Sequence, residues 1–138
     1  MPRVFVDTWF FIAFLHKFDP DHAAAMRLAH AYRGAMFFTH DGVLTELLTF
    51  FSGQGSFWRN AAAVVVREAM LAKNYKVTPV SRHLFANALD LYERRADKEY
   101  SLVDCTSMHL MLRRDITHVL TNDHHFRQEG FTVVSDVR

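Results

Sequence analysis

Four acidic residues stand where a carboxylate could do chemistry. Asp7 directly follows the apolar run 4–6, and Asp123 comes soon after the apolar segment 118–120. Glu46 and Asp104 lie among apolar neighbours in segments with helical periodicity, and neither has a Lys or Arg three or four residues away. Acidic side chains are seldom buried without a partner. A bound metal ion is therefore the natural counter-charge for this set.

The available ligand types predict which metal would bind. The chain has one cysteine, no CxxC motif and no pair of histidines spaced as HxxxH. Hard carboxylate oxygens favour Mg²⁺ or Mn²⁺ over Zn²⁺. Such an ion polarises a phosphoryl group and lowers the pKa of an attacking water. The four acids therefore predict hydrolysis of a phosphodiester bond.

Three hydroxyl side chains stand close in sequence to these acids. Thr8 and Thr121 are predicted to orient the carboxylates, since hydroxyl groups around a metal site commonly do so; the alternative is that both are ordinary helix or turn caps. Ser107 lies one turn beyond Asp104. It either faces the same cleft or is a small packed residue of the helix.

Other charged residues have simpler interpretations. Asp41 is interpreted as a helix cap, and the pair His124 and His125 as part of a surface turn, with contact to phosphate as the alternative. The arginine pairs 94–95 and 113–114 either form a rim that binds phosphate or stabilise helix C-termini through the helix dipole.

Short apolar runs alternate along the chain with segments of helical periodicity, a pattern typical of an α/β domain with a parallel sheet. We predict four to five strands with helices on both faces, and Pro79 favours an edge position for the third strand. In such sheets the ligand site lies beyond the carboxyl ends of the strands, where the strand order reverses. The predicted strands are 4–6, 35–38, 75–80, 118–120 and 131–134; the predicted helices are 8–15, 19–32, one from Thr39 or Asp41 to 51, 57–73, 81–95 and 101–113, with a helical turn at 123–128.

The composition limits the class of protein. A chain of 138 residues fits one domain, 1–138, and 50% apolar with 22% charged residues is ordinary globular usage. The lone Cys105 allows no internal disulfide, which fits a reducing compartment. No apolar run approaches the ~18–20 residues that span a bilayer, and no signal peptide is recognisable. We expect a cytoplasmic protein without membrane association. Sequestering four acids in one site leaves a mildly basic remainder, because the net charge is +1.

Four segments of the sequence, in order, carry a family resemblance. They are 4–8 (VFVDT), 44–47 (LTEL), 100–108 (YSLVDCTSM) and 119–126 (VLTNDHHF). With these segments the chain resembles PIN-domain proteins, most closely the compact bacterial ribonucleases of the VapC-like toxin type. The resemblance covers nearly the whole chain, and the last two segments are the most specific pair.

The resemblance implies a three-layer α/β/α fold and a metal-dependent endoribonuclease that leaves 5′-phosphate and 3′-hydroxyl ends. It implies one or two Mg²⁺ or Mn²⁺ ions, a homodimer, an RNA substrate and an inhibitory antitoxin protein. We expect Asp7, Asp104 and Asp123 to hold the main ion and Glu46 to orient water or hold a second ion. A hydroxyl near the last acid is usual in the family, and Thr121 matches it.

Two other classes of function remain as alternatives. A catalytically silent PIN-fold module would keep the fold for binding RNA or protein. A phospho-accepting receiver domain is also α/β with Mg²⁺, but it requires paired acids after the first strand and an acceptor at the end of the third. Here Asp7 stands alone, and the third strand ends in Thr78-Pro79-Val80.

Overall fold

The computed structural model describes residues 1–135, which form five strands and seven helices. The predicted order of elements is confirmed. The elements are β1 (Arg3–Val6), α1 (Thr8–Leu15), α2 (His22–Ala31), β2 (Met36–His40), α3 (Asp41–Phe51), α4 (Ser56–Leu71), β3 (Tyr75–Thr78), α5 (Arg82–Arg94), α6 (Leu102–Arg113), β4 (His118–Leu120), α7 (His125–Gln128) and β5 (Thr132–Val134).

All strands are parallel, in the order β3-β2-β1-β4-β5. The central strand β1 is the most buried, with Val4, Phe5 and Val6 at most 1% exposed. Continuous apolar runs of this kind are expected where a parallel sheet is covered on both faces. The strand order reverses between β1 and β4, so the carboxyl ends of these two strands define the place where a ligand site is expected.

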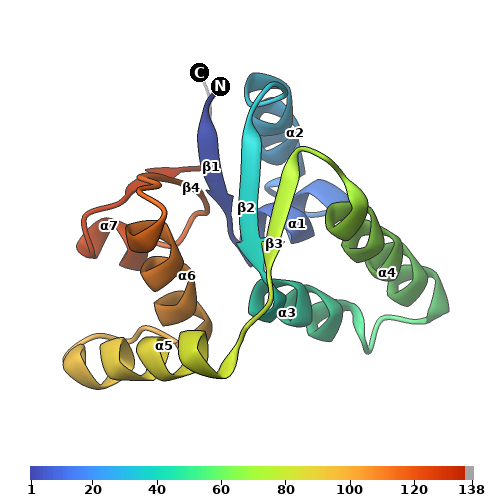
Figure 1. Cartoon of the computed structure of the whole chain (residues 1–138). Helices are drawn as coiled ribbons and strands as arrows, with labels where there is room; N and C mark the ends of the chain where they lie inside the picture. The colour runs from blue at the N-terminus through green and yellow to red at the C-terminus, as the bar shows by residue number, and fades with distance from the viewer. Residues whose placement is uncertain (136–138) are drawn as a thin grey trace.

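Helices lie on both sides of the sheet (Figure 1). Helices α1, α2 and α4 gather on one side, and α5 and α6 pack against each other on the other. Helix α3 lies beyond the carboxyl ends of the strands and contacts α1, α4 and α6. The predicted three-layer α/β/α fold is confirmed. Among residues 1–135, no helix combines the length and apolar character needed to cross a membrane.

The prediction for the start of α3 is wrong in one respect. Strand β2 extends to His40, which pairs with Thr78 of β3, so the helix cap falls between the two candidates Thr39 and Asp41. The His40 side chain accepts a hydrogen bond from the Gly42 N–H, whereas the Asp41 carboxylate accepts one from the Val80 N–H. Asp41 therefore ties α3 to the end of β3 and does not cap its own helix.

Candidate functional site

Asp7 lies at the carboxyl end of β1, at the reversal of strand order. It occupies the N-cap position of α1, but its side chain makes no capping hydrogen bond. Instead its Oδ2 accepts a 2.7 Å hydrogen bond from the hydroxyl of Thr121, which is fully buried after β4. The pKa of Asp7 is raised to about 7, mainly by burial; the Thr121 hydroxyl opposes this rise, and the carboxylates of Asp104 and Glu46 contribute to it. The pKa of an acid placed in this way is unusually sensitive to a nearby cation.

Glu46 reaches the same region from the second turn of α3. Its Oε1 accepts a 2.6 Å hydrogen bond from the Thr8 hydroxyl, at the first residue of α1. Burial raises the pKa of Glu46, and the Asp104 carboxylate adds to that rise, while the Thr8 hydroxyl opposes it. Each of the first two acids thus has its own threonine donor, which fixes one carboxylate oxygen and leaves the other available.

Asp104 is positioned by the start of α6. Ser101 and Asp104 form a capping box: the Asp104 N–H donates to the Ser101 hydroxyl, and the Ser101 N–H donates to Oδ2 of Asp104, both at 3.0 Å. The two hydrogen bonds fix the carboxylate rotamer at the helix N-terminus. Burial raises the pKa of Asp104, and the Asp123 carboxylate adds to that rise.

Asp123 lies in the turn between β4 and α7. Its N–H donates to the Thr121 hydroxyl at 3.1 Å, so one threonine connects Asp7 with Asp123. Its Oδ1 accepts a 2.9 Å hydrogen bond from the His125 N–H and lies 3.1 Å from Nδ1 of the same residue. The turn thereby places the His125 imidazole beside the carboxylates.

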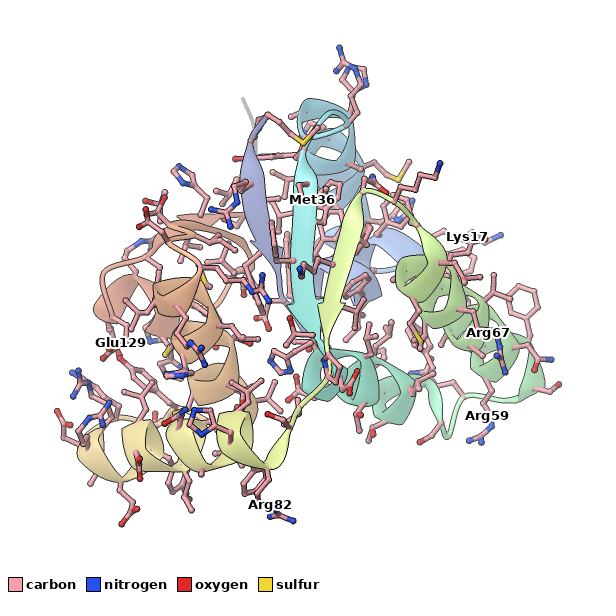
Figure 2. The ribbon with its side chains drawn as sticks, in the orientation of Figure 1. Lys17, Met36, Arg59, Arg67, Arg82 and Glu129 are labelled. Carbon is pink, nitrogen blue, oxygen red and sulfur yellow. The ribbon has the colours of Figure 1, made fainter. Side chains whose placement is uncertain are left out.

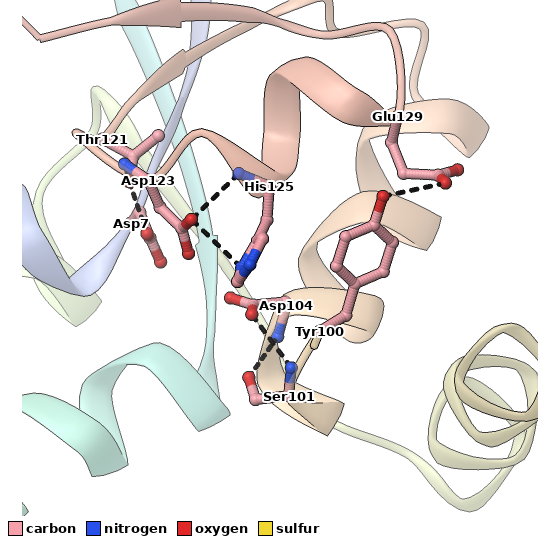
Figure 3. Close-up of polar contacts among 8 residues, drawn as sticks. All are labelled: Asp7, Tyr100, Ser101, Asp104, Thr121, Asp123, His125 and Glu129. Carbon is pink, nitrogen blue, oxygen red and sulfur yellow. Dashed lines mark hydrogen bonds and ion pairs between the residues drawn. The ribbon is translucent and has the colours of Figure 1, made fainter. Parts of the chain in front are cut away.

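Asp7, Asp104 and Asp123 lie close together (Figure 3), and Glu46 lies near Asp7 and Asp104. Ligand atoms of Asp104, Asp123 and His125 all lie within 4.8 Å of one another, a spacing that one cation could bridge. Asp104 and Glu46 are close enough to Asp7 to raise its pKa, and Asp104 also raises the pKa of Glu46. The set of donors is dominated by carboxylate oxygen, which fits Mg²⁺ or Mn²⁺, and one imidazole is compatible with Mn²⁺.

Sequence reasoning missed His125 as a site residue. It is only half-buried, but it faces the acids and packs edge-on against Tyr100, with ring centroids 5.5 Å apart. Tyr100 in turn donates to Glu129, which forms a 2.6 Å ion pair with Arg95. No periodic pattern marks a histidine in a short turn, so only its position after Asp123 could have indicated this role.

Ser107 is fully buried and contacts His40 and Val103. Its hydroxyl donates to the Val103 carbonyl at 3.0 Å and lies 2.9 Å from Nε2 of His40. Because Nδ1 of His40 accepts from Gly42, its Nε2 carries the proton that Ser107 accepts. Burial lowers the pKa of His40 to about 4, which agrees with a neutral ring. His40 therefore links α3, which carries Glu46, to α6.

Comparison with known proteins gives matches over almost the whole chain. The family model described as PIN domain matches residues 4–131. The 23S rRNA-specific endonuclease VapC20, from two strains of Mycobacterium tuberculosis, is 30% identical over 131 residues, which cover 95% of this chain and 97% of that protein. The crystal structure of the Mycobacterium tuberculosis VapC20, described as a sarcin–ricin loop cleaving toxin, superposes with a TM-score of 0.82 at 29% identity and covers 94% of this chain and 96% of that one. The range matched by the family model spans the four acids and His125.

Proposed function

Because the chain belongs to the PIN-domain family, we propose that it is an endoribonuclease, the toxin of a toxin–antitoxin pair. The resemblance inferred from the sequence is confirmed by the family match and by the likeness to VapC20. The observation that carries the chemical part of the proposal is the approach of Asp104, Asp123 and His125 to within 4.8 Å, next to a buried Asp7. Like charges placed so close together indicate a cation site.

We assign the acids the following roles. Asp7, Asp104 and Asp123 hold the main Mg²⁺ or Mn²⁺ ion, and Glu46 orients water or helps to hold a second ion. His125 holds the Asp123 carboxylate and adds an imidazole to the ligand set. When bound, the metal supplies Lewis acidity toward the phosphoryl oxygens and makes water a better nucleophile.

The chain's own residues prepare this site in three ways. Thr8 and Thr121 fix the rotamers of Glu46 and Asp7 by donating to one oxygen each. Burial strengthens the electrostatic attraction between the carboxylates and any cation. In hydrolysis the water oxygen bonds to phosphorus, the bond to the 3′-oxygen breaks and that oxygen takes up a proton. The products then carry a 5′-phosphate and a 3′-hydroxyl.

For the substrate we propose structured ribosomal RNA, and for the partners an antitoxin protein and a second copy of the chain. The support for this substrate is that the relatives are named as acting on 23S rRNA and the sarcin–ricin loop. Exposed apolar side chains, among them Phe18, Phe57 and Leu71 at 75%, 72% and 84% exposure, support protein partners. We place the protein in the cytoplasm, where ribosomal RNA is found.

The test is cleavage of purified 23S rRNA by the full chain, with Mg²⁺ or Mn²⁺ and with a chelator. We expect cleavage only with metal, 5′-phosphate ends, and at least a hundred-fold loss of rate in Asp7→Asn. Asp90→Asn, on the exposed face of α5, removes the same charge outside the site and is the matched control. Cleavage that survives both chelation and Asp7→Asn contradicts the proposal, and absence of both cleavage and metal binding by calorimetry favours the silent binding module.

A further inference from the structure

A basic cleft lies far along α6 from the acids. Its volume is about 340 Å³, and it is bordered by the connection from β3 to α5 and by the C-terminal half of α6. None of the residues that line it is acidic. The lining includes Thr78, Ser81, His83, Leu110, Arg113 and Arg114.

Positive groups converge at the α6 side of this cleft. The guanidinium groups of Arg3 and Arg114 lie 5.0 and 5.8 Å from the centre of the same Phe38 ring. Nη1 of Arg3 also donates to the Arg114 carbonyl at 2.8 Å. Within residues 1–135, no ion pair with a carboxylate involves Arg3, Arg113 or Arg114. Among residues 1–135, no carboxylate therefore neutralises the charges gathered here.

His109 lies in the same positively charged surroundings. Burial lowers the pKa of His109, and Arg113, His83 and Arg94 lower it further. Its Nε2 is buried without a hydrogen-bond partner among the described residues. The potential on this side of α6 is positive enough to oppose protonation of a nearby group.

Stabilisation of helix ends does not explain the arrangement. Cations at the end of α6 are favoured by the helix dipole, so Arg113 and Arg114 alone need no further reason. Arg82 and His83, however, occupy the first turn of α5, where the dipole disfavours positive charge (Figure 2 labels Arg82). An anion in the cleft would meet both His83 and the two arginines at the end of α6, all of which line it.

Helix α6 also connects the cleft to the acids. Asp104 lies in its first turn and Arg113 in its last, about 13 Å apart along the axis at 1.5 Å per residue. Val103 and Thr106 line a second hollow, which lies between α3, α5 and the start of α6. Leu110, about one helical turn after Thr106, lines the basic cleft. An RNA strand that reaches both the cleft and the acids therefore spans most of the length of α6 and passes around the helix, because Asp104 and Arg113 are nine residues apart.

We propose that the cleft formed by His83, Arg113 and Arg114 is a secondary phosphate-binding site for the RNA backbone, a few nucleotides from the scissile bond. This inference rests on the proposed ribonuclease function, since it takes RNA as the polyanion. Arginine is suited to the task because its planar fork binds phosphate oxygens in pairs. Contacts of this kind fix the register of the RNA and make binding dependent on salt.

The test measures RNA binding as a function of salt concentration. Asp7→Asn is the common background, so that no RNA is cleaved, and a fluorescently labelled RNA hairpin is the probe. We expect Arg113→Gln with Arg114→Gln to weaken binding at low salt by ten-fold or more. The slope of log affinity against log salt should become shallower by about 1.4 to 1.8, the loss of two phosphate contacts. Arg67→Gln with Lys73→Gln, exposed positions on α4 and just after it, is the control of equal charge and should change the slope by less than half as much.

A second variant separates charge from folding. Arg113→Lys with Arg114→Lys keeps both charges and should keep most of the salt slope. Equal slopes for the glutamine pair and the control pair overturn the inference, as does loss of the slope in the lysine pair. If the hairpin binds through the cleft but the protein with Asp7 intact cleaves no RNA, the proposed function is refuted. The cleft then remains an RNA-binding site. A cleft that binds an acidic antitoxin segment and not RNA leaves the hairpin slope unchanged and overturns the inference.

Discussion

Replacing Asp7 by asparagine should stabilise the metal-free protein at neutral and alkaline pH. Burial raises the pKa of Asp7 from its ordinary value of 3.8 to about 7. Between these two values the folded chain holds a proton that the unfolded chain has lost, so the free energy of unfolding falls as the pH rises. The loss is complete above about pH 7 and amounts to about 4 kcal/mol, since each pKa unit corresponds to about 1.4 kcal/mol. Asparagine does not ionise and avoids that loss.

The assay is urea unfolding of the wild type and Asp7→Asn at several pH values in the presence of a chelator. The Thr121 hydroxyl can still donate to the asparagine oxygen, so the variant keeps the hydrogen bond seen at Asp7. We expect nearly equal stability near pH 4 and a variant more stable by up to about 4 kcal/mol above pH 7. Asp90→Asn controls for the loss of one charge. Adding Mg²⁺ or Mn²⁺ at a hundred times its Kd should narrow the difference between wild type and Asp7→Asn by about 2.7 kcal/mol, because the ion stabilises the folded wild type by that amount.

A variant that is equally stable or less stable than the wild type at pH 8, in chelator, would refute this reasoning. It would mean that the Asp7 carboxylate has enough solvent or donors to ionise normally, and that the repulsion from Asp104 and Glu46 is weak. Stabilisation by metal that is unchanged in Asp7→Asn would separately show that Asp7 is not a ligand. The two measurements together distinguish a buried acid from a metal-binding one.

Substitutions at three further positions test the support around the acids. Thr8→Val removes the 2.6 Å donor to Glu46, and we expect a 10–100-fold loss of metal affinity or cleavage rate with a change of at most about 1 kcal/mol in stability, measured by calorimetry and unfolding. His40→Ala leaves the Gly42 N–H without its partner and opens a cavity at a fully buried position, so the free energy of unfolding should fall by about 2–4 kcal/mol. His40→Asn can still cap α3 and should recover part of that loss. Gly42→Ala would place a Cβ 2.8 Å from the His40 ring, so we expect a loss of about 1–3 kcal/mol in chemical denaturation, and a variant as stable as the wild type would show that the ring moves freely.

The fold was predictable because its signals are local. Each buried strand is a short apolar run, and each helix carries its own periodicity and punctuation, such as Ser81 before α5 and Ser101 before α6. Pro79 correctly indicated an edge strand, since β3 lies at the end of the sheet. In a parallel α/β sheet the carboxyl ends of strands meet at one edge. Asp7 and Asp123 could therefore be placed near each other without knowledge of any long-range contact.

The roles that sequence could not supply depend on which side chains meet across elements. Thr39, His40 and Asp41 are all plausible at the start of α3, and the pairing of His40 with Thr78 in the sheet decides among them. The contact between His40 and Ser107 joins residues that are 67 positions apart, and no local pattern encodes it. His125 enters the site through a turn whose geometry depends on the Asp123 side chain. Site residues held by tertiary contacts were missed or misread for this reason.

The arrangement of donors explains why four acids can share one region of a folded protein. The Thr121 hydroxyl serves Asp7 and also accepts the Asp123 N–H, the Thr8 hydroxyl serves Glu46, and the Ser101 capping box holds Asp104. Hydrogen bonds to a charged carboxylate favour the charged form, so they reduce the pKa rise that burial and repulsion impose. In the part of the chain that the structure describes, the hydrogen bonds of these acids use no arginine or lysine. A fixed cationic side chain would compete with a metal ion for the same oxygens, whereas neutral donors orient the carboxylates and leave their net charge intact. In the proposed function, this residual repulsion is the property that would give the site affinity for a divalent cation.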